Sequence, residues 1–206
     1  MPRPIGARNH DFELKRAALV DSMTGYALEA DLRRPSLRQF AIAAKASEPT
    51  LRHYFDDRQG VVEAILENMG KRATWIWDVI AHPAGNPTEA IEEYYRVADA
   101  GMRYGHFTRA HAFGLIEGIA DDNAGRAYLK FLLEPGLKSI MDKLEATPDG
   151  PASRDALRTA AFAIMAPLLF MSIHQKLLGG EADFPIDNQA TIQHLQSWLG
   201  RALTSG

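Results

Sequence analysis

A polar cluster with an apolar backing lies in the stretch EPTLRHYFDDRQGVVEAIL, which begins at position 48. On a helical wheel with about 100° per residue, Leu51, Tyr54 and Phe55 share one arc, whereas Arg52 and His53 point the other way. An arginine donates paired hydrogen bonds to a guanine edge, and histidine or threonine side chains contact phosphates or bases. The polar arc therefore suits contact with nucleic acid, although an ordinary amphipathic surface helix has the same pattern.

The rest of the chain lacks the patterns of catalytic and metal sites. It contains no cysteine, which excludes a thiolate nucleophile, a disulfide framework and cysteine-based metal sites. The histidines form no His-Glu-x-x-His pair, and His106 and His111 diverge on a helix because they are five residues apart. No phosphate-loop or Gly-x-Ser-x-Gly spacing occurs. We therefore expect no enzyme activity, no metal site and no cofactor.

The elements that position these residues are expected to be helices. Almost every segment has a helical period, and no alternating run bounded by turn signals predicts a strand. Pro35 interrupts the first helix, and Ser36 and Ser47 are placed to cap the next two helices, the second of which has Pro49 in its first turn. Later helices are expected from near residue 57 to 80 and over 87–104, 106–120, 123–146, 152–178 and 188–203. The predicted fold class is all-α with about nine helices, two of which Pro135 and Pro167 should kink or divide.

The second and third helices have the spacing of a helix-turn-helix. Leu37, Phe40, Ala41 and Ala44 form the apolar stripe of the second helix, and about four residues separate it from the third. The second helix of such a motif enters the major groove with its N-terminal residues at base edges. The polar face around Arg52 is then the face directed at the bases.

At this point the residues resemble the TetR (tetracycline-repressor) family of bacterial transcription regulators. That family has a Thr-Leu-Tyr-x-His-Phe-like segment followed by a lysine before an apolar helix. Thr50, Leu51 and Phe55 match this segment, Ser47 matches just before it, and Arg58 occupies the lysine position. The resemblance extends by motif over about residues 12–66.

The resemblance implies a two-domain regulator. Residues 1–56 would form an N-terminal three-helix DNA-binding domain with an arm, and residues 57–206 a C-terminal helical ligand-binding and dimerisation domain. The implied function is ligand-responsive transcription regulation by a repressor that a small apolar or amphipathic effector releases from a palindromic double-stranded DNA operator. The alternative is a helical module that binds a small molecule or protein and whose helix-turn-helix no longer binds DNA.

The resemblance also assigns DNA contacts residue by residue. The expected DNA-binding residues lie in the second helix, the turn, the third helix and the start of the fourth: Arg38, Lys45, Ser47, Thr50, Arg52, His53, Tyr54 and Arg58. Lys45 stands where the turn usually has glycine, so we expect a left-handed conformation there at ~1 kcal/mol, or a different turn. Glu48 suits the helix dipole but repels phosphate unless it accepts a bond from a cytosine amino group. Arg3 and Arg8 lie in an arm that either reaches a minor groove or is a disordered tail.

The last two helices are expected to form a homodimer. The segment ALRTAAFAIMAPLLFMSIHQKLL is apolar nearly all round, and the final helix carries Ile192, Leu195, Leu199 and Ala202 on one stripe. A monomer of this size would struggle to cover both helices, so we expect a two-fold four-helix interface. The fourth helix connects the two domains, so we expect it to transmit effector binding to the DNA-binding domain.

Candidate effector contacts are aromatic, methionine and isolated polar residues on the middle helices, where an apolar cavity would hold a few orienting polar groups. Each is also a plausible core residue. They are Met102, His106, Phe113, Glu117, Tyr128, Phe131, Met171 and His174.

Composition is consistent with a soluble cytoplasmic protein. The chain has 206 residues and a net charge of −3. The first 60 residues carry ten basic and eight acidic side chains, against 13 basic and 18 acidic in the remainder. This asymmetry would let one end face phosphate. No signal peptide is recognisable, and the longest apolar run, residues 160–173, is too short to span a bilayer, so we expect no membrane segment.

Overall fold

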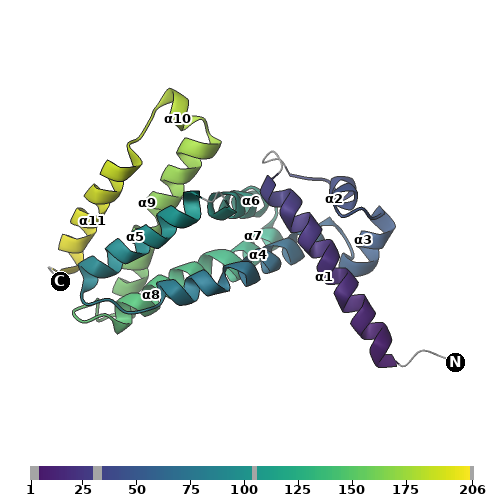
Figure 1. Ribbon diagram of the computed structural model, residues 1–206, viewed down its shortest axis with the longest axis horizontal. Helices are drawn as coiled ribbons and strands as arrows, with labels where there is room; N and C mark the ends of the chain where they lie inside the picture. The colour runs from purple at the N-terminus through teal and green to yellow at the C-terminus, as the bar shows by residue number, and fades with distance from the viewer. Residues whose placement is uncertain (1–4, 30–33, 104–105, 205–206) are drawn as a thin grey trace. The chain divides into compact units, whose positions relative to one another are not determined.

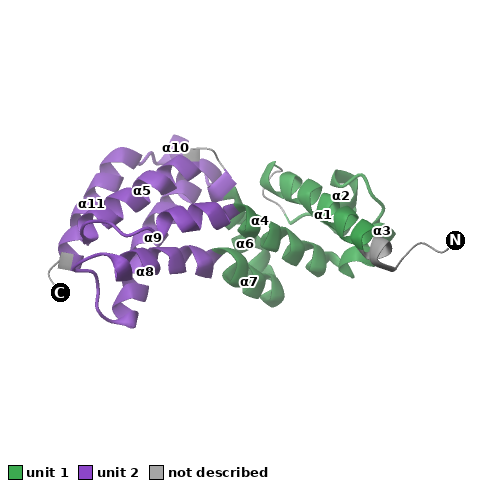
Figure 2. Cartoon of the chain, turned by 60° about the horizontal axis from the view of Figure 1, so that its bottom comes forward, with its two compact units in different colours: residues 1–72, 109–132 green, residues 73–108, 133–206 purple. Residues whose placement is uncertain are grey.

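The computed structural model describes residues 5–29, 34–103 and 106–204, and within these ranges every regular element is a helix (Figure 1). The all-α prediction is confirmed. The chain divides into two compact units, shown in different colours in Figure 2. Unit 1 comprises Met1–Arg72 and Arg109–Leu132, and unit 2 comprises Ala73–Thr108 and Leu133–Gly206.

The helix positions follow the sequence prediction closely, but their number is higher. The helices are α1 (Ile5–Glu29), α2 (Leu37–Ala43), α3 (Glu48–Phe55), α4 (Arg58–Ile80), α5 (Pro87–Arg103), α6 (His106–Ala120), α7 (Asp122–Tyr128), the π-helix η1 (Leu129–Leu133), α8 (Glu134–Ala146), α9 (Arg154–Leu177), α10 (Gly180–Asp183) and α11 (Asn188–Thr204). The helix expected over 123–146 is divided at η1, because Pro135 lacks an N–H and occupies the first turn of α8. Pro167 lies inside α9 without dividing it.

The compact units do not follow the boundary expected between residues 56 and 57. Unit 1 contains α1, α2 and α3, the first part of α4, and the segment Arg109–Leu132 with α7. Ion pairs described below join that later segment to the helix-turn-helix region. The helix α4 runs from one unit into the other, as a continuous Arg58–Ile80 helix.

The core of unit 1 forms where the apolar stripes of its helices meet. Met23 of α1, Phe40 of α2, Leu51 of α3, and Val61 and Ile65 of α4 are all fully buried. Helix α2 packs against both α1 and α3. The packing therefore fixes which face of α3 is turned away from the protein.

Unit 2 is a bundle in which α5, α8, α9 and α11 pack side by side (Figure 1). Its core includes the fully buried Ile91, Tyr95, Ile140 and Leu144. A buried cation is accommodated here, because Lys143 donates to the carbonyl of His82 at 2.7 Å and to Glu93 at 2.5 Å. Unit 2 thus has an apolar centre with satisfied polar groups at its margin.

The helix α9 is the one element of the described chain that is long and apolar enough, by length and composition, to cross a membrane. It has 24 residues and is longer than the apolar run of 160–173 on which the prediction of no membrane span rested. Half of its most apolar window is buried inside the protein, as in the core helix of a bundle.

Candidate nucleic-acid interface

The helix-turn-helix predicted from the sequence is present in α2 and α3. Ser36 caps α2 through a capping box, in which its hydroxyl accepts from the Gln39 amide and the Gln39 side chain accepts from the Ser36 amide. Ser47 caps α3 by accepting from the Thr50 amide at 3.2 Å. Pro49 lies in the first turn of α3, as expected. Both caps predicted from the sequence are confirmed.

The turn between these helices is a Schellman motif built around Lys45. The amide of Lys45 donates to the carbonyl of Ile42 at 3.0 Å, and the amide of Ala46 donates to that of Ala41 at 2.9 Å. The φ angle of Lys45 is 50°, so the left-handed conformation expected there is confirmed. A side chain in this region is strained by about 1 kcal/mol relative to glycine. In return, the turn displays an exposed ammonium group beside α3.

The two faces of α3 are separated as the helical wheel predicted. Leu51 is fully buried and Phe55 is nearly so, with the guanidinium of Arg16 lying 5.1 Å from the centroid of the Phe55 ring. Arg52 and His53 are exposed on the other side. The exposed face therefore carries hydrogen-bonding groups, and the buried face fixes its direction.

Tyr54 is held by α1 and is only partly exposed. Its ring lies 4.5 Å from that of Phe12, with an interplanar angle of 31°. The His53 ring meets the same Phe12 ring edge-on at 5.8 Å. This packing anchors the outer edge of α3 and leaves Tyr54 less available for contact than Arg52.

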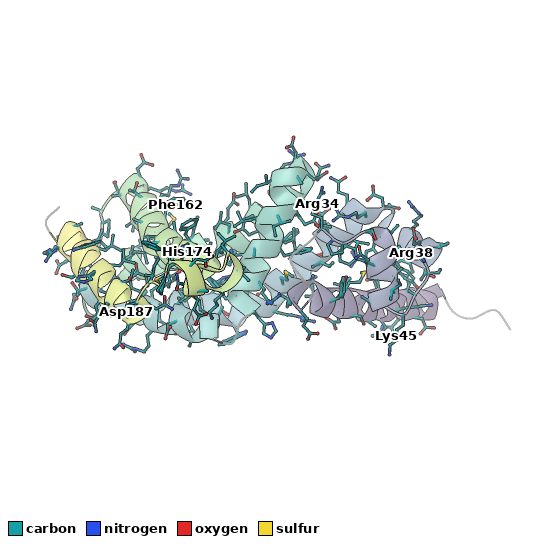
Figure 3. All side chains as sticks on the ribbon, turned by 90° about the horizontal axis from the view of Figure 1, so that it is seen from above. Arg34, Arg38, Lys45, Phe162, His174 and Asp187 are labelled. Atoms are coloured by element: carbon teal, nitrogen blue, oxygen red, sulfur yellow. The ribbon has the colours of Figure 1, made fainter. Side chains whose placement is uncertain are left out.

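The remaining expected DNA contacts on α2 and α3 are accessible to different degrees. Arg38 and Lys45, both labelled in Figure 3, are exposed. The hydroxyls of Ser47 and Thr50 lie 2.8 Å apart and form a hydrogen bond with each other. A contact with DNA would use the donor or acceptor positions that this bond leaves. Arg8 belongs to α1, which begins at Ile5 where the sequence suggested an arm, and Arg3 lies outside the described residues.

Arg58 is the expected contact that the structure engages most fully. Its Nε donates to the carbonyl of Pro35 at 2.7 Å, and its Nη1 and Nη2 donate to the two carboxylate oxygens of Glu117 at 3.0 Å and 2.5 Å. The Nε of Arg34 also donates to Glu117, at 3.1 Å. Glu117 is completely buried, whereas the Arg58 and Arg34 side chains are 28% and 42% exposed. We call these three residues the Glu117 clamp.

The clamp changes how two sequence expectations are interpreted. Arg58 was expected to contact phosphate, but Glu117 neutralises its charge in this structure. Glu117 was expected to line an effector cavity, but its oxygens are occupied by the two arginines. An acid in the apolar stretch FGLIEGIA signals a buried partner, yet its partners are 59 and 83 residues away in the sequence.

A second polar contact joins the same parts of unit 1. The Gln59 amide donates to Asp121 Oδ1 at 3.0 Å, and that oxygen also accepts from the amides of Asn123 and Ala124 at the start of α7. The first turn of α4 is therefore tied to the end of α6 as well as to its buried acid. Through Arg58, the same turn of α4 is also bonded to the Pro35 carbonyl just before α2.

The expected effector contacts are divided equally between the two units. Phe113 is buried, and Tyr128 is buried with its hydroxyl 2.8 Å from His111 Nδ1. Phe131 lies under the ammonium of Lys130, and His106 is exposed. The Nδ1 of His174 lies 2.7 Å from the Gln175 amide nitrogen. Two of the expected residues, Met102 and Met171, line a hollow in unit 2.

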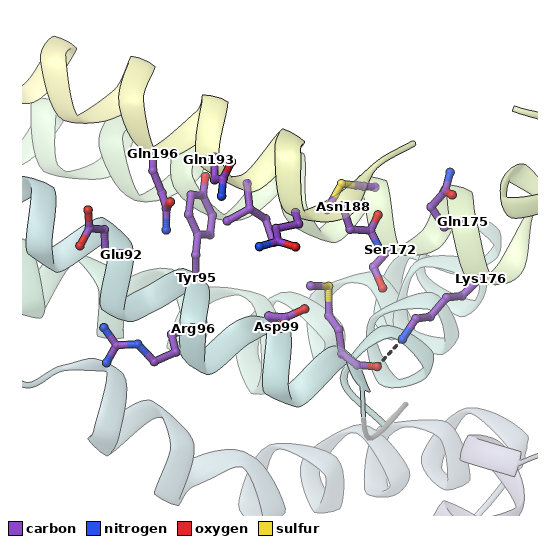
Figure 4. A pocket seen from close by; sticks show the side chains of 14 residues that line it. Glu92, Tyr95, Arg96, Asp99, Ser172, Gln175, Lys176, Asn188, Gln193 and Gln196 are labelled. Carbon is purple, nitrogen blue, oxygen red and sulfur yellow. Dashed lines mark hydrogen bonds between the residues drawn. The ribbon is translucent and has the colours of Figure 1, made fainter. Parts of the chain in front are cut away.

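That hollow lies among α5, α9 and α11 and has a volume of about 700 Å³ (Figure 4). Most of the side chains around it are polar, which differs from the apolar cavity expected from the sequence. Its size lies within the range of pockets that hold small organic molecules. It is thus a candidate ligand site within unit 2.

The structure is similar to the crystal structure of a TetR transcriptional regulator from Rhodococcus sp. RHA1. The TM-score is 0.56 at 16% sequence identity, and the similarity covers 91% of this chain and 95% of that chain. No protein-family model matches the sequence, and no curated protein matches it. At this identity the similarity establishes the fold, so the chain has the fold of a TetR regulator.

Proposed function

We propose that this protein, whose fold is that of a TetR regulator, is a cytoplasmic, dimeric DNA-binding transcription regulator. It acts as a repressor that leaves a palindromic operator when a small effector binds unit 2. The observation that carries the proposal is the capped helix-turn-helix of α2 and α3, with Arg52 and His53 exposed on the second helix.

The exposed groups of the motif divide into two kinds of DNA contact. Arg52 is on the outer face of α3, where a guanidinium pairs with a guanine edge. Arg38 and Lys45 lie on α2 and in the turn, and their exposed cations suit phosphates on either side of the groove. Ser47 and Thr50, at the start of α3, suit hydroxyl contacts to the backbone.

A second copy of the chain is the partner proposed for the outer faces of α9 and α11. Phe162 and Phe170 are 58% and 65% exposed and lie eight residues apart, within about 80° on the surface of α9. On α11, Trp198 is 58% exposed and stacks on His194 at 5.7 Å. Large exposed aromatic side chains at this density mark an interaction surface. A two-fold pair would supply one recognition helix to each half-site of a palindrome.

The effector response is proposed to pass through α4. This helix begins with Arg58 in the Glu117 clamp and continues to Ile80 in unit 2. An effector that prefers one arrangement of unit 2 over another would change the distance between the two recognition helices of the dimer. Operator affinity would then fall because both half-sites are no longer met together.

A second function is supported by the charge of the motif. Glu48 lies in the first turn of α3, and Arg58 is neutralised by Glu117, so the interface is less basic than its sequence suggests. The alternative is a helical binding module whose helix-turn-helix no longer contacts DNA.

The test is binding of the full chain to DNA from upstream of its own gene, with unrelated DNA as the comparison, at two salt concentrations. We expect selective binding that weakens with salt, and a loss of about tenfold or more in Arg52→Ala. Lys138→Ala, which removes an exposed cation from α8, is the matched control and should bind like the parent. If the parent binds the upstream and the unrelated DNA equally, and Arg52→Ala binds both as the parent does, the result would instead support the helical module that no longer contacts DNA.

A further inference from the structure

The hollow in unit 2 has a wall of amide side chains that α11 provides. Gln189, Gln193 and Gln196 follow a helical spacing of four and three residues, and Asn188 lies at the start of the same helix. None of these four side chains makes a hydrogen bond to another residue in the described part of the chain. Each amide therefore offers both a donor and an acceptor to a bound molecule.

The facing wall comes from α5 and carries charges of both signs. Glu92 and Arg96 are exposed there, and Asp99 lies one turn further on (Figure 4). Glu92 and Arg96 are four residues apart without forming an ion pair. On the α9 side, the Lys176 ammonium donates to the Met102 carbonyl at 2.5 Å. Two cations and two acids leave the hollow without a net charge that would select an anion or a cation.

A buried hydroxyl without a partner lies in the wall of this hollow. Tyr95 is 1% exposed and projects from α5 toward α11 (Figure 4). Among the described residues, its hydroxyl is the buried side-chain polar atom that lacks a hydrogen-bond partner. Burial raises the pKa of Tyr95, so the hydroxyl stays protonated and can both donate and accept. A buried polar group without a partner destabilises the protein and is relieved by a ligand that supplies one.

The polar lining favours a polar ligand over the small apolar or amphipathic effector that the sequence suggested. Met102, Met171 and Ile192 are the apolar members of the lining, and they are too few to enclose a hydrocarbon chain. A hydroxyl group is both donor and acceptor, like the amides and the tyrosine that face it. Exposed Glu92 and Arg96 are solvated and contribute little to binding of an ion.

We propose that this hollow binds a neutral polyhydroxylated small molecule, such as a sugar or polyol, through the α11 amides and the Tyr95 hydroxyl. Because the hydroxyl is covered in this structure, side chains around it have to move for the ligand to reach it. The proposed binding site does not depend on whether the protein binds DNA. The role of the ligand as the effector rests on the function proposed above.

The first experiment is calorimetric titration of the full chain with glucose, trehalose and myo-inositol, in parallel with glycine, glutamine and a medium-chain fatty acid. We expect binding in the sugar and polyol arm. Tyr95→Phe should weaken it by about threefold to tenfold, the effect of one lost hydrogen bond, and Gln193→Leu by a similar factor. Tyr94→Phe and Ser197→Ala are matched controls, because Tyr94 is a neighbouring buried tyrosine outside the lining and Ser197 is exposed elsewhere on α11.

The thermal midpoint separates a ligand contact from a structural role. Since the Tyr95 hydroxyl has no partner, Tyr95→Phe should not lower the midpoint of the free protein, whereas loss of a structural hydrogen bond would lower it. No binding in the sugar and polyol arm, tighter binding of the amino acids or fatty acid, or binding unchanged in both Tyr95→Phe and Gln193→Leu would overturn the proposal. Sugar binding that is sensitive to both variants but leaves operator affinity unchanged would support this site and refute the effector response.

Discussion

Glu117→Gln should destabilise unit 1 far more than a single polar substitution usually does. The side chain is completely buried, and its carboxylate receives three hydrogen bonds from Arg34 and Arg58. Glutamine has nearly the same shape, but it removes the negative charge and places an amide donor against the arginine donors. The guanidinium groups of Arg34 and Arg58 would then lose the negative charge that offsets their own.

The magnitude follows from burial on each side of the pair. Removing one partner of a buried ion pair typically costs about 3–5 kcal/mol, because the remaining charge is left uncompensated. Here Arg58 is 28% exposed and Arg34 is 42% exposed, so water recovers part of that loss. We therefore expect the free energy of opening of unit 1 to fall by about 2–4 kcal/mol.

Amide hydrogen exchange measures this loss in the right place. Amides of α6 and of the first turns of α4 should exchange faster in Glu117→Gln, and those of α9 should be unchanged. The matched control is Asp142→Asn, which removes the acid of the exposed Lys138–Asp142 pair and should change stability by less than about 0.5 kcal/mol. If Glu117→Gln changes exchange no more than Asp142→Asn does, the clamp contributes nothing to stability.

The same substitution has a separate consequence for DNA binding. Releasing Arg58 from its carboxylate frees one cation at the start of α4, where it was expected to meet phosphate. Each new phosphate contact steepens the dependence of log affinity on log salt by about 0.9. An unchanged salt slope in Glu117→Gln would show that Arg58 does not face DNA even when released.

Three further predictions concern single positions. Gly70→Ala should lower the free energy of unfolding, measured in urea, by about 1–3 kcal/mol, because the added Cβ would lie 2.3 Å from the Phe131 carbonyl oxygen. Gly25→Ala on α1 should raise it by roughly 0.5–1 kcal/mol, because the added Cβ meets no atom within 4 Å and alanine favours the helix. Burial lowers the pKa of His111 to about 4, so between pH 6.5 and 4 the unfolded chain binds a proton that the folded chain does not. The free energy of unfolding should therefore fall by about 3 kcal/mol over that range. His111→Gln should flatten this trend in urea titrations at different pH. Lys45→Gly should raise the urea midpoint, because glycine removes about 1 kcal/mol of strain from the left-handed backbone conformation at this position. A lower midpoint would show that the Lys45 side chain stabilises the turn.

Local features of the sequence predicted the helix-turn-helix accurately. Ser36 and Ser47 are caps in the structure, and Lys45 has the left-handed conformation its position required. Each of these depends on hydrogen bonds between residues three to five apart, which spacing alone reveals. The buried and exposed arcs of α3 were predictable for the same reason.

Long-range polar contacts were not predictable in this way. Glu117 was predicted as an isolated polar effector contact on the middle helices, but nothing local distinguishes an effector contact from a buried ion pair with Arg34 and Arg58. The hollow beside Tyr95 likewise exists only because α5 and α11 pack together. The sequence analysis did not single out the amides of α11, because only that pairing places them opposite α5.

The charge left on the helix-turn-helix explains why the proposed regulator would need two copies. Glu117 offsets only one of the two guanidinium charges of Arg34 and Arg58, and both groups are held against its carboxylate. The exposed cations of α2, α3 and the turn are Arg38, Lys45 and Arg52. About three cations per half-site give a salt slope near −3, and hence weak binding by one motif at physiological salt. Joining two motifs makes the second contact intramolecular and multiplies affinity without any new cation. A small change in the distance between the motifs would remove that gain, so a weakly charged interface is the kind that an effector can release.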